Sequence, residues 1–510
     1  MIIYWRFIGD LLVKGEKMKT LPPENIHTEY KESKKNIPND MWETVSAFAN
    51  TEGGNIFLGI KEIKHENGFK EFIPQGVKNI EKQKEDLLNT VKDKSKISIP
   101  AFKEKDIKFI KINNKDIIQI SVSQAKYNDV PVFLKGDPKK AYIREGERDS
   151  LASREELVNM IKNTEETDNF DLLDGFSVKD DLKLIDVQNY KALIYEQTQN
   201  EAFLNMDIPE FLFNIGLIKK DRKDGKKKIT KAALLLFGKF NSIVEVYHSF
   251  LLDFIIKSNS TDADYIDRIV TSNAPNSPEN IFGFYTAVSN KINSLIDNKF
   301  ELSGLVRKDN GEKLIVILRE ALVNCLVHAD YRSKLPTKIT FLNDKIIFEN
   351  AGKMLAPVDE FFLNTGSVTR NDLIFQIFMI AKIGEHTGSG GYRIKNNSDQ
   401  MKLLTPKIDT SYQKTKLIIW KITEEDIIKT LPEKWQETYK IISEKLIVKY
   451  KDLEHLYKNR YEGRNILSAM IDKGLIEKTG KNKGTRYSIP VSSPTGRKII
   501  SDYINGLQKL

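Results

Sequence analysis

The stretch Arg319-Glu-Ala-Leu-Val-Asn-Cys-Leu-Val-His-Ala-Asp-Tyr331 combines an apolar helical pattern with a polar stripe. Glu320, Asn324 and His328 recur every four residues, so in a helix they share one edge. Such an edge costs free energy unless solvent or a ligand meets it, and the stretch alone leaves both readings open. The apolar positions recur at helical spacing and predict a buried helix: Leu314, Leu318, Ala321, Leu322 and Cys325.

Two further polar segments follow this helix in a fixed order. Predicted strands at 249–257 and 337–341 flank the helices of this part. Asn350-Ala-Gly352 ends the segment 344–352, and a glycine-rich run fills Ile383-Gly-Glu-His-Thr-Gly-Ser-Gly-Gly-Tyr-Arg393. Over residues 315–395 this order resembles the GHKL ATPase superfamily, and more closely the divergent ATP-binding domain commonly fused behind AlbA_2. The resemblance implies an α/β sandwich that binds one ATP with Mg²⁺.

The resemblance also implies a role for each motif. Asn324 would hold Mg²⁺ through its amide oxygen, and Glu320 would orient or deprotonate the water that hydrolyses ATP. Asn350 and Gly352 stand where the superfamily has an adenine-binding Asp-x-Gly. A nucleotide that serves only as a switch ligand is an alternative to hydrolysis, and His328 is at least as well explained as a structural residue. The glycines expected to let a lid wrap the phosphates are Gly384, Gly388, Gly390 and Gly391.

The N-terminal part predicts a strand at 24–31, a helix at 41–50, a two-glycine break and a buried strand at 55–60. Glu24…Glu29-Tyr-Lys31, Val45-Ser-Ala-Phe-Ala-Asn-Thr-Glu-Gly-Gly54 and Ala141-Tyr-Ile-Arg144 occur in this order. Together they resemble the AlbA_2 domain shared by Schlafen proteins and many bacterial regulators, over residues 18–165. The resemblance implies an α/β module that binds nucleic acid.

In Schlafen nucleases a carboxylate triad cuts structured RNA with a divalent metal. Glu24 and Glu29 match its first two members, and the third, usually Asp, falls at Glu62, which is one methylene longer. Three clustered carboxylates hold Mg²⁺ or Mn²⁺ well, but ordinary sheet-surface charges would look the same in sequence. The basic residues expected to contact phosphates here are Lys31, Lys34, Lys35, Lys135, Lys139, Lys140, Arg144 and Arg148.

Residues 166–229 form a predicted connector. It contains a helix at 187–200 and a hairpin that turns at Asp224-Gly225 within a lysine-rich run. The run favours a solvated turn over a nucleic-acid-binding wing.

Residues 426–510 predict a helix at 435–444, a helix-turn-helix pair at 451–456 and 463–472, and a hairpin at 474–489. This pattern resembles a winged helix, which binds nucleic acid in some proteins and serves as a dimerisation module in others. Arg460, Arg464 and Asn465 are candidates for base contacts. The candidates for phosphate contacts are Lys478, Lys481, Lys483 and Arg486.

The composition suits globular domains: 40% of the 510 residues are hydrophobic, 30% are charged, and the net charge is +9. The single cysteine, Cys325, excludes a disulfide within the chain and fits a cytoplasmic location, and no apolar run approaches the roughly 20 residues of a membrane helix.

We therefore predict an α/β (α+β) multidomain protein with domains at 1–165, 166–229, 230–425 and 426–510. In it Mg-ATP controls nucleic-acid binding, in a homo-oligomer that regulates transcription or acts in antiviral defence. The rival hypotheses are a nucleotide-gated, metal-dependent endoribonuclease and an interaction scaffold with a vestigial ATP site.

Overall fold

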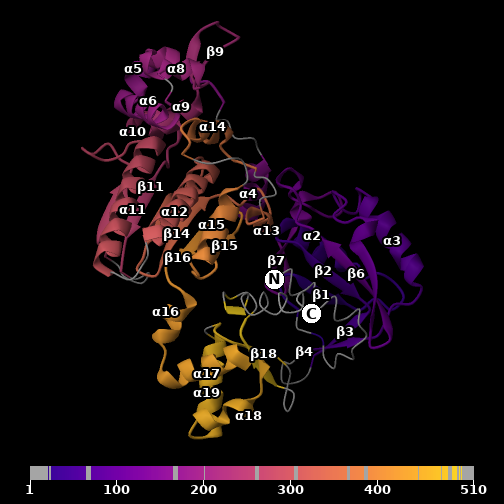
Figure 1. The fold of residues 1–510 in the computed structure, drawn as a ribbon. Helices are drawn as coiled ribbons and strands as arrows, with labels where there is room; N and C mark the ends of the chain where they lie inside the picture. Colours follow the sequence, from indigo (N-terminus) through magenta and orange to yellow (C-terminus); the bar gives the residue numbers. More distant parts are fainter. Residues whose placement is uncertain are drawn as a thin grey trace. The chain divides into compact units, whose positions relative to one another are not determined.

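The structure is a computed structural model. It describes residues 21, 24–64, 70–164, 170–199, 201–258, 264–303, 308–363, 368–383, 389–445, 447–472, 474–479, 485–490, 493 and 495–496. Helices and several separate sheets confirm the predicted α/β multidomain class (Figure 1). The chain divides into two compact units. The first consists of Met1–Glu166, Gly352–Pro357 and Ser411–Gln413, and the second contains the rest.

The first unit is built on a four-stranded sheet of order β1-β2-β6-β5. The predicted helix is confirmed as α2 and connects β1 to β2, and these two strands pair in parallel. The other two pairings are antiparallel. Apolar side chains of α2 pack on the sheet because Met41, Val45 and Phe48 recur on one helix face. These elements are β1 (Thr28–Lys31), α2 (Met41–Asn50), β2 (Gly54–Leu58), β5 (Ile107–Ile112) and β6 (Lys115–Val122).

Two hairpins and two further helices complete this unit. One hairpin pairs β3 with β4 and the other pairs β7 with β8, and β7 packs against α2. Three short 3-10 turns lie in the connections: Glu104–Asp106, Tyr127–Asp129 and Pro138–Lys140. The elements are β3 (Ile60–Lys64), β4 (Lys70–Pro74), α3 (Ile80–Lys92), β7 (Tyr142–Glu145), β8 (Arg148–Leu151) and α4 (Arg154–Thr164).

The second unit begins with short helices around a hairpin. The predicted hairpin is confirmed: Lys220 lies opposite Lys227, and Gly225 in the turn has a φ of +73°, which favours glycine. The elements are α5 (Val178–Asp181), α6 (Leu184–Thr198), α7 (Ala202–Asn205), α8 (Ile208–Asn214), β9 (Ile218–Lys220), β10 (Lys227–Ile229), α9 (Lys231–Phe237) and α10 (Phe240–Val246).

A six-stranded sheet of order β12-β11-β13-β14-β16-β15 forms the centre of the second unit. Strands β11 and β13 run parallel, and the other pairings are antiparallel. The predicted strands near 249–257 and 337–341 are confirmed as β11 and β13. The bounds are β11 (Leu252–Ile256), β12 (Asp267–Val270), β13 (Thr337–Phe341), β14 (Lys345–Ala351), β15 (Lys407–Thr410) and β16 (Lys414–Trp420).

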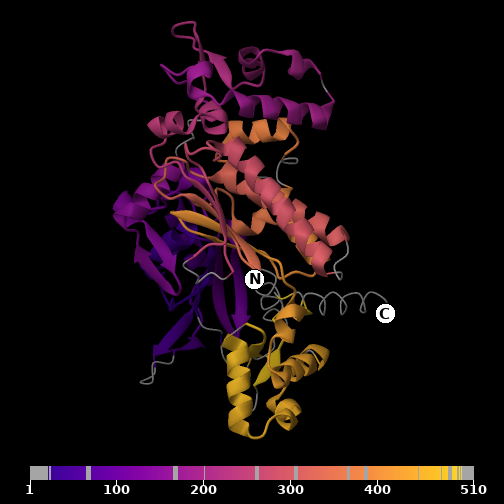
Figure 2. The same ribbon diagram turned by 90° about the vertical axis from the view of Figure 1, so that its left-hand side faces the viewer.

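Long helices lie beside this sheet (Figure 2). The predicted buried helix is confirmed as α12, which contacts α11, α15 and strand β14. Leu318, Leu322 and Leu326 of α12 are fully buried in the core shared by these elements. The helices are α11 (Ile281–Ser303), α12 (Lys308–His328), α13 (Val358–Phe361), α14 (Asp372–Ile380) and α15 (Gly390–Gln400).

The C-terminal part has its own small core, formed by residues such as Ile442, Leu453 and Leu467. Its strands pair in the order β17-β19-β18, and the predicted helices and hairpin are present. Within the described parts of the chain, none of the helices has the length and apolar character needed to cross a membrane. The elements are α16 (Glu424–Lys429), α17 (Glu433–Lys445), β17 (Ile447–Val448), α18 (Tyr450–Leu453), a 3-10 turn (Glu454–Leu456), α19 (Arg460–Asp472), β18 (Glu477–Thr479) and β19 (Arg486–Ser488).

Candidate nucleotide site and carboxylate cluster

The polar edge of α12 faces the first residues of α15. The leucines of α12 enter the core, and this orientation turns Glu320 and Asn324 towards the neighbouring helix. A Cβ atom at Gly390 would lie 2.7 Å from Oε2 of Glu320 and 3.2 Å from Nδ2 of Asn324. The backbone at Gly390 therefore comes close to both side chains, and three predicted site residues lie together.

The side-chain nitrogen of Asn324 is buried without a hydrogen-bond partner among the described residues. A buried polar atom left unpaired costs about 1–3 kcal/mol, so the position favours a ligand atom. The oxygen and nitrogen of an amide exchange places by a 180° rotation, so either atom can be presented at this point. This unsatisfied amide is the feature of the site that its own protein contacts do not explain.

Glu320 is buried next to a basic residue that the sequence analysis missed. Its Oε1 lies 3.8 Å from Nη1 of Arg393 on α15, and only 6% of the residue is exposed. Burial raises the pKa of Glu320, while Arg393 and Arg319 lower it. A raised pKa makes a carboxylate a stronger base than a fully exposed one. Arg393 stands three residues after Gly390, on the same side of a helical turn, which is the signal that would have revealed it.

The N-terminus of α15 carries two of the predicted lid glycines. Ser389 precedes the helix, Gly390 and Gly391 open it, and free backbone N–H groups with a partial positive charge lie at such an end. A Cβ atom at Gly391 would lie 2.0 Å from the carbonyl oxygen of Phe361, so this backbone packs too closely for a side chain. The other two predicted lid residues, Gly384 and Gly388, lie outside the described residues.

Asn350 lies on β14 and is 7% exposed. Its Nδ2 donates to the carbonyls of His328 at 3.4 Å and Ala351 at 3.2 Å, which ties the end of β14 to the end of α12. Burial and then Arg370 lower the pKa of His328 to about 4, so its ring is neutral at pH 7. Gly352 has a φ of +92° and donates its N–H to the Gln413 carbonyl at 2.9 Å.

The carbonyl groups at the C-terminus of α12 are held by side chains that the sequence analysis did not single out. Asn371 donates to the carbonyls of Val327 and Ala329, both at 2.8 Å, and Arg370 donates to that of His328 at 3.1 Å. These bonds satisfy groups that a helix end leaves open. They hold the C-terminal end of α12, and with it the polar edge of this helix, in position.

In the first unit, Glu24 and Glu62 lie on either side of a lysine. Nζ of Lys70 on β4 is 3.6 Å from Oε2 of Glu24 and 3.6 Å from Oε1 of Glu62. The same Nζ is 3.2 Å from Oε2 of Glu147. Lys70 and Glu147 were not predicted, because only the pairing of β3 with β4 and the β7–β8 turn bring them to this place.

Glu29, the third predicted triad member, has different partners. Its Oε2 accepts from Nη2 of Arg144 at 2.8 Å, and its Oε1 lies 2.9 Å from Nζ of Lys31. Nη1 of Arg144 donates to Asp149 at 2.8 Å, and the Arg144 side chain is fully buried. Arg144 is therefore buried inside the unit and is not exposed for the phosphate contact that the sequence analysis expected. Lys34 and Lys35, by contrast, are exposed in the bend after β1.

The carboxylates of this cluster influence one another electrostatically. Burial and then the Glu29 charge raise the pKa of Glu24 to about 7, with a further contribution from Glu62. The Tyr30 N–H, which donates to Glu24 at 3.0 Å, and Lys70 act in the opposite direction. We define the carboxylate cluster as Glu24, Glu29 and Glu62. It concentrates negative charge that attracts cations, and Glu24 gains or loses a proton near neutral pH.

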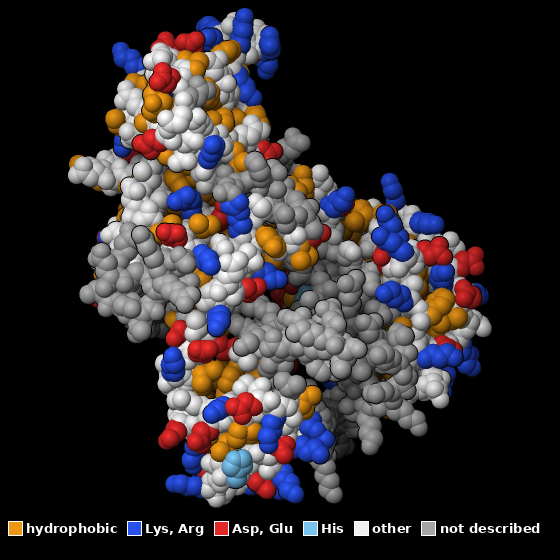
Figure 3. Space-filling model, in the orientation of Figure 1, with side chains coloured by type: hydrophobic (Ala, Val, Ile, Leu, Met, Phe, Trp, Pro, Cys, Tyr) orange, Lys and Arg blue, Asp and Glu red, His pale blue; other side chains and the backbone are white. Residues whose placement is uncertain are grey.

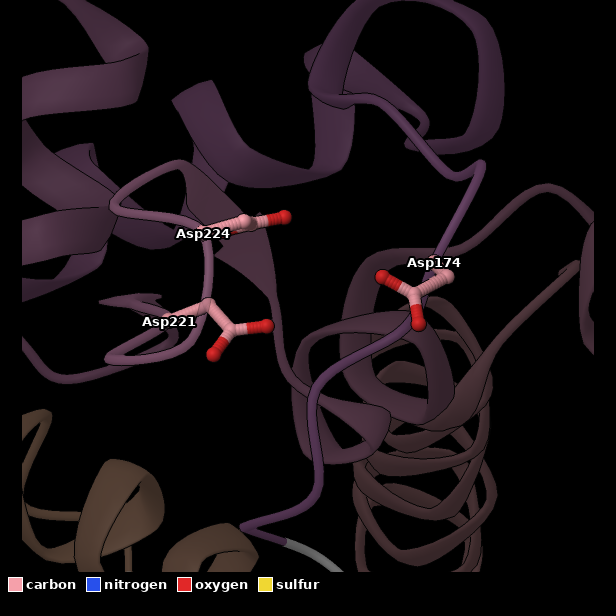
Figure 4. Close-up of side chains that lie close together, drawn as sticks. All are labelled: Asp174, Asp221 and Asp224. Atoms are coloured by element: carbon pink, nitrogen blue, oxygen red, sulfur yellow. The ribbon is translucent and has the colours of Figure 1, made fainter.

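A tighter acidic group lies elsewhere. Among the described residues, Asp174, Asp221 and Asp224, and not the carboxylate cluster, have ligand oxygens that all lie within 4.8 Å of one another (Figure 4). Nζ of Lys228 is 2.5, 2.6 and 2.8 Å from oxygens of Asp174, Asp221 and Asp224, and these bonds raise the pKa of Lys228. Lys228 therefore already serves as the counter-ion, and the group fastens the β9–β10 hairpin.

The predicted nucleic-acid contacts of the C-terminal part are partly described. Arg464 is exposed on α19, and Arg486 on β19 donates to the Thr485 carbonyl at 3.0 Å. Lys481 and Lys483 lie outside the described residues. Basic and acidic side chains alternate over this part in Figure 3, so this view shows no uniformly basic face.

Three family models match separate parts of the chain. "Schlafen, AlbA_2" matches residues 24–153, "Putative ATP-dependent DNA helicase recG C-terminal" matches residues 336–419, and a domain of unknown function, DUF8451, matches residues 158–253. The first match contains the carboxylate cluster. The second contains Asn350, Gly352 and the lid glycines, whereas Glu320 and Asn324 precede it.

No curated protein matches the chain. The crystal structure of the DIP2311 protein from Corynebacterium diphtheriae is 12% identical, covers 96% of this chain and 100% of that chain, and has a TM-score of 0.38. The solution structure of the N-terminal domain of a "Putative ATP-dependent DNA Helicase RecG-related Protein" from Nitrosomonas europaea is 24% identical. It covers 24% of this chain and 82% of that chain, with a TM-score of 0.19. At these TM-scores neither structure supports an argument about this chain.

The chain thus joins a Schlafen-type AlbA_2 domain to an ATPase-type domain. This combination is that of a nucleic-acid-associated, ATP-binding protein.

Proposed function

We propose that Mg-ATP binding on the polar edge of α12 controls how this protein binds nucleic acid. The observation that carries the proposal is the buried amide nitrogen of Asn324, which has no partner among the described residues although it faces the glycine-opened end of α15. A buried amide is retained at such a cost when a ligand satisfies it. The neighbouring acidic side chain, basic side chain and helix N-terminus are the groups that a metal-bound triphosphate requires.

The residues present fit this ligand. Asn324, with its amide rotated, would bind Mg²⁺ through Oδ1, an oxygen ligand of the kind that Mg²⁺ prefers. The N–H groups at the N-terminus of α15, where Gly390 and Gly391 stand, would bind phosphate oxygens. Glu320 would accept the proton of an attacking water, and Arg393 keeps that carboxylate in place. Bound Mg²⁺ would supply the positive charge that neutralises the triphosphate.

Calorimetric titration of the full chain with ATP, with and without Mg²⁺, tests the site. We expect micromolar binding that needs Mg²⁺, and a loss of affinity on the order of 100-fold in Asn324→Ala. Glu320→Gln should still bind ATP but release no phosphate. Asn89→Ala on α3, an exposed asparagine, is the matched control. A wild-type protein that does not bind ATP would contradict the proposal and favour the vestigial scaffold.

Nucleic acid would meet the protein at its two ends. In the first unit, Lys34 and Lys35 are exposed in the bend after β1. In the C-terminal part, the order of α18, α19 and the β18–β19 hairpin is what a winged helix would require, and it exposes Arg464 on α19. Regulation of transcription, or defence against foreign nucleic acid, would follow from ATP-dependent binding of this kind.

Fluorescence anisotropy with labelled duplex DNA and structured RNA, with and without Mg-ATP, distinguishes the targets. Each phosphate contact steepens the salt dependence of binding, so Lys34→Ala with Lys35→Ala should lower affinity and flatten that dependence. Light scattering of the same samples tests the proposed homo-oligomer, which should change size or stability with Mg-ATP. Equal affinity for both nucleic acids with and without nucleotide would contradict control by ATP.

A metal-dependent endoribonuclease is the second candidate. The electrostatic coupling of Glu24 with Glu29 and Glu62 favours it, because mutually repelling carboxylates are stabilised by a divalent cation. Incubation with structured RNA and Mn²⁺ tests it. Cleavage that disappears in Glu24→Ala and Glu29→Ala, persists in the exposed control Glu85→Ala and increases in Glu62→Asp would support the nuclease. Binding of RNA without cleavage would contradict the nuclease and favour the first proposal, in which Mg-ATP controls nucleic-acid binding.

A further inference from the structure

Two short segments from the second half of the sequence belong to the first compact unit. Gly352–Pro357 follows strand β14, and Ser411–Gln413 forms the connection between β15 and β16. All three of these strands belong to the six-stranded sheet of the second unit. The N-terminal domain is therefore completed by residues that are continuous with the ATPase-type sheet.

The side chains of these segments bind the end of helix α2. Nζ of Lys353 donates to the carbonyls of Asn50 at 2.9 Å and Thr51 at 3.0 Å. The hydroxyl of Tyr412 donates to the Asn50 carbonyl at 2.5 Å, and the Lys353 ammonium lies 4.3 Å from the centre of the Tyr412 ring. A helix leaves its last carbonyls unpaired and carries a partial negative charge there. A buried cation with two carbonyl partners meets both needs.

Hydrogen bonds continue from this point to the carboxylate cluster. Oγ1 of Thr51 accepts from the backbone N–H of Arg144 at 2.9 Å. The Arg144 guanidinium donates to Glu29 at 2.8 Å and to the carbonyls of Asn25 at 2.9 Å and Thr28 at 3.2 Å. Each step lies within the first unit. Lys353 is thus joined to Glu29 through Thr51 and Arg144.

Lys353 also lies close in sequence to the nucleotide motif. It follows Asn350-Ala-Gly352 directly, so from Asn350 the chain spans at most about 10 Å. Burial lowers the pKa of Lys353 to about 8, against an opposite effect of Glu52. The ammonium is costly to bury unless the α2 carbonyls receive it, so movement of the β14 end and of the α2 end is linked.

We propose that Lys353 and Tyr412 are positioning residues that hold the end of α2 and transmit the nucleotide state to the carboxylate cluster. The transmission rests on the proposed function, because it requires ATP to bind beside β14. ATP changes the cluster only to the extent that its affinity differs between two positions of this strand end.

Hydrogen exchange of the full-length protein, followed by mass spectrometry with and without Mg-ATP, tests the proposal. In the wild type we expect Mg-ATP to slow exchange about threefold or more in peptides that cover 47–54 and 142–145, since these amides report local opening. Lys353→Met should abolish this change while the Kd for ATP stays within about threefold, and Lys353→Arg should restore part of it. Lys414→Met is the control, because Lys414 is a half-exposed lysine paired with Glu349 at 3.0 Å.

The outcomes separate this inference from the proposed function. If ATP binds but leaves exchange at 47–54 unchanged, or if Lys353→Met keeps the full response, the coupling is wrong while the nucleotide site stands. If calorimetry detects no ATP binding in the wild type, the proposed function fails and the coupling fails with it. Tyr412→Phe removes one hydroxyl only and gives the same test, with a reduced response expected, should Lys353→Met not fold.

Discussion

The carboxylate cluster and the polar edge of α12 both bury charge, but they satisfy it differently. In the cluster, Glu29 is bonded to Arg144 and Lys31, and Glu24 lies beside Lys70 and accepts a backbone N–H. Oε1 of Glu62 makes no hydrogen bond among the described residues, but it lies 3.6 Å from the Lys70 ammonium. On α12, the Asn324 amide nitrogen is buried without a partner among the described residues.

This difference indicates how each site depends on a ligand. In a cluster with internal cations, any metal must compete with lysine and arginine for the same oxygens. On the edge of α12, the unpaired amide costs free energy until a ligand atom bonds to it. The following variants test the two sites, in order of expected effect.

Arg144→Met should lower the free energy of unfolding by about 3–5 kcal/mol, because it leaves Asp149 without its cation and Glu29 with Lys31 as its remaining cation. Urea denaturation, followed through the unfolding of the first unit, measures this change. The matched control is Arg148→Met on β8, where the arginine is exposed and the expected change is below about 0.5 kcal/mol. Equal stability of the two variants would show that the cluster does not need its internal cation.

Glu24→Gln should change the pH dependence of stability. The pKa of Glu24 in the folded protein is about 7, above the ordinary value of 4.5. Its stabilising contribution is therefore complete below pH 4.5 and is lost as the pH rises to 7, by about 3 kcal/mol at 1.36 kcal/mol per pKa unit. The Glu24→Gln variant should be more stable than the wild type at pH 8. Its free energy of unfolding should also depend less on pH between pH 4.5 and 7.

Unfolding measurements at pH 4.5, 6 and 8, expressed as the difference between wild type and variant, isolate this carboxyl from the others. Glu85→Gln on the exposed face of α3 should show no such trend. A constant difference across the three pH values would contradict the raised pKa of Glu24.

Asn324→Ala should separate binding from stability. We expect ATP affinity to fall on the order of 100-fold, or about 2.7 kcal/mol, while the unfolding free energy changes by less than about 1 kcal/mol, since the Nδ2 atom makes no bond that is lost. Calorimetry and denaturation of the same preparation measure both quantities. Strong destabilisation would mean that Asn324 has a structural rather than a ligand-binding role.

Lys70→Met should open the carboxylate cluster to an external cation. Because Lys70 lies within 3.6 Å of Glu24 and Glu62, its removal should raise Mn²⁺ affinity at pH 8 by about threefold or more. Calorimetric titration with MnCl₂ measures the affinity. Lys64→Met is the control, because that lysine is largely exposed and lies 3.7 Å from Glu62. Unchanged Mn²⁺ binding in Lys70→Met would show that Lys70 does not compete for the cluster.

Local patterns predicted many elements of the fold correctly. Apolar spacing located α2 and α12, and local sequence patterns also located β11, β13 and the β9–β10 hairpin. The same logic placed Glu320 and Asn324 on one edge, because an i, i+4 spacing puts side chains on one face of any helix. The roles of these two residues remain predictions, as do the domain boundaries and the winged helix.

Contacts between distant residues were not predictable in this way. Arg144 was assigned to a phosphate by its charge, yet it is buried against Glu29, 115 positions earlier in the chain. Lys353 reaches the Asn50 carbonyl across 303 positions. Charge and spacing in a sequence do not state which face of a strand is covered, so a buried arginine and an exposed one look alike.

The sequence by itself determined the order of helices and strands, the polar stripe of α12 and the glycines that follow it, because these depend on periodicity and backbone freedom within a few residues. Only the tertiary structure decided which charges neutralise one another. It put Lys70 among three carboxylates, left the Asn324 amide without a partner among the described residues and brought Lys353 to the end of α2. These outcomes depend on strand pairing and packing across the chain, where burial makes each unpaired charge costly.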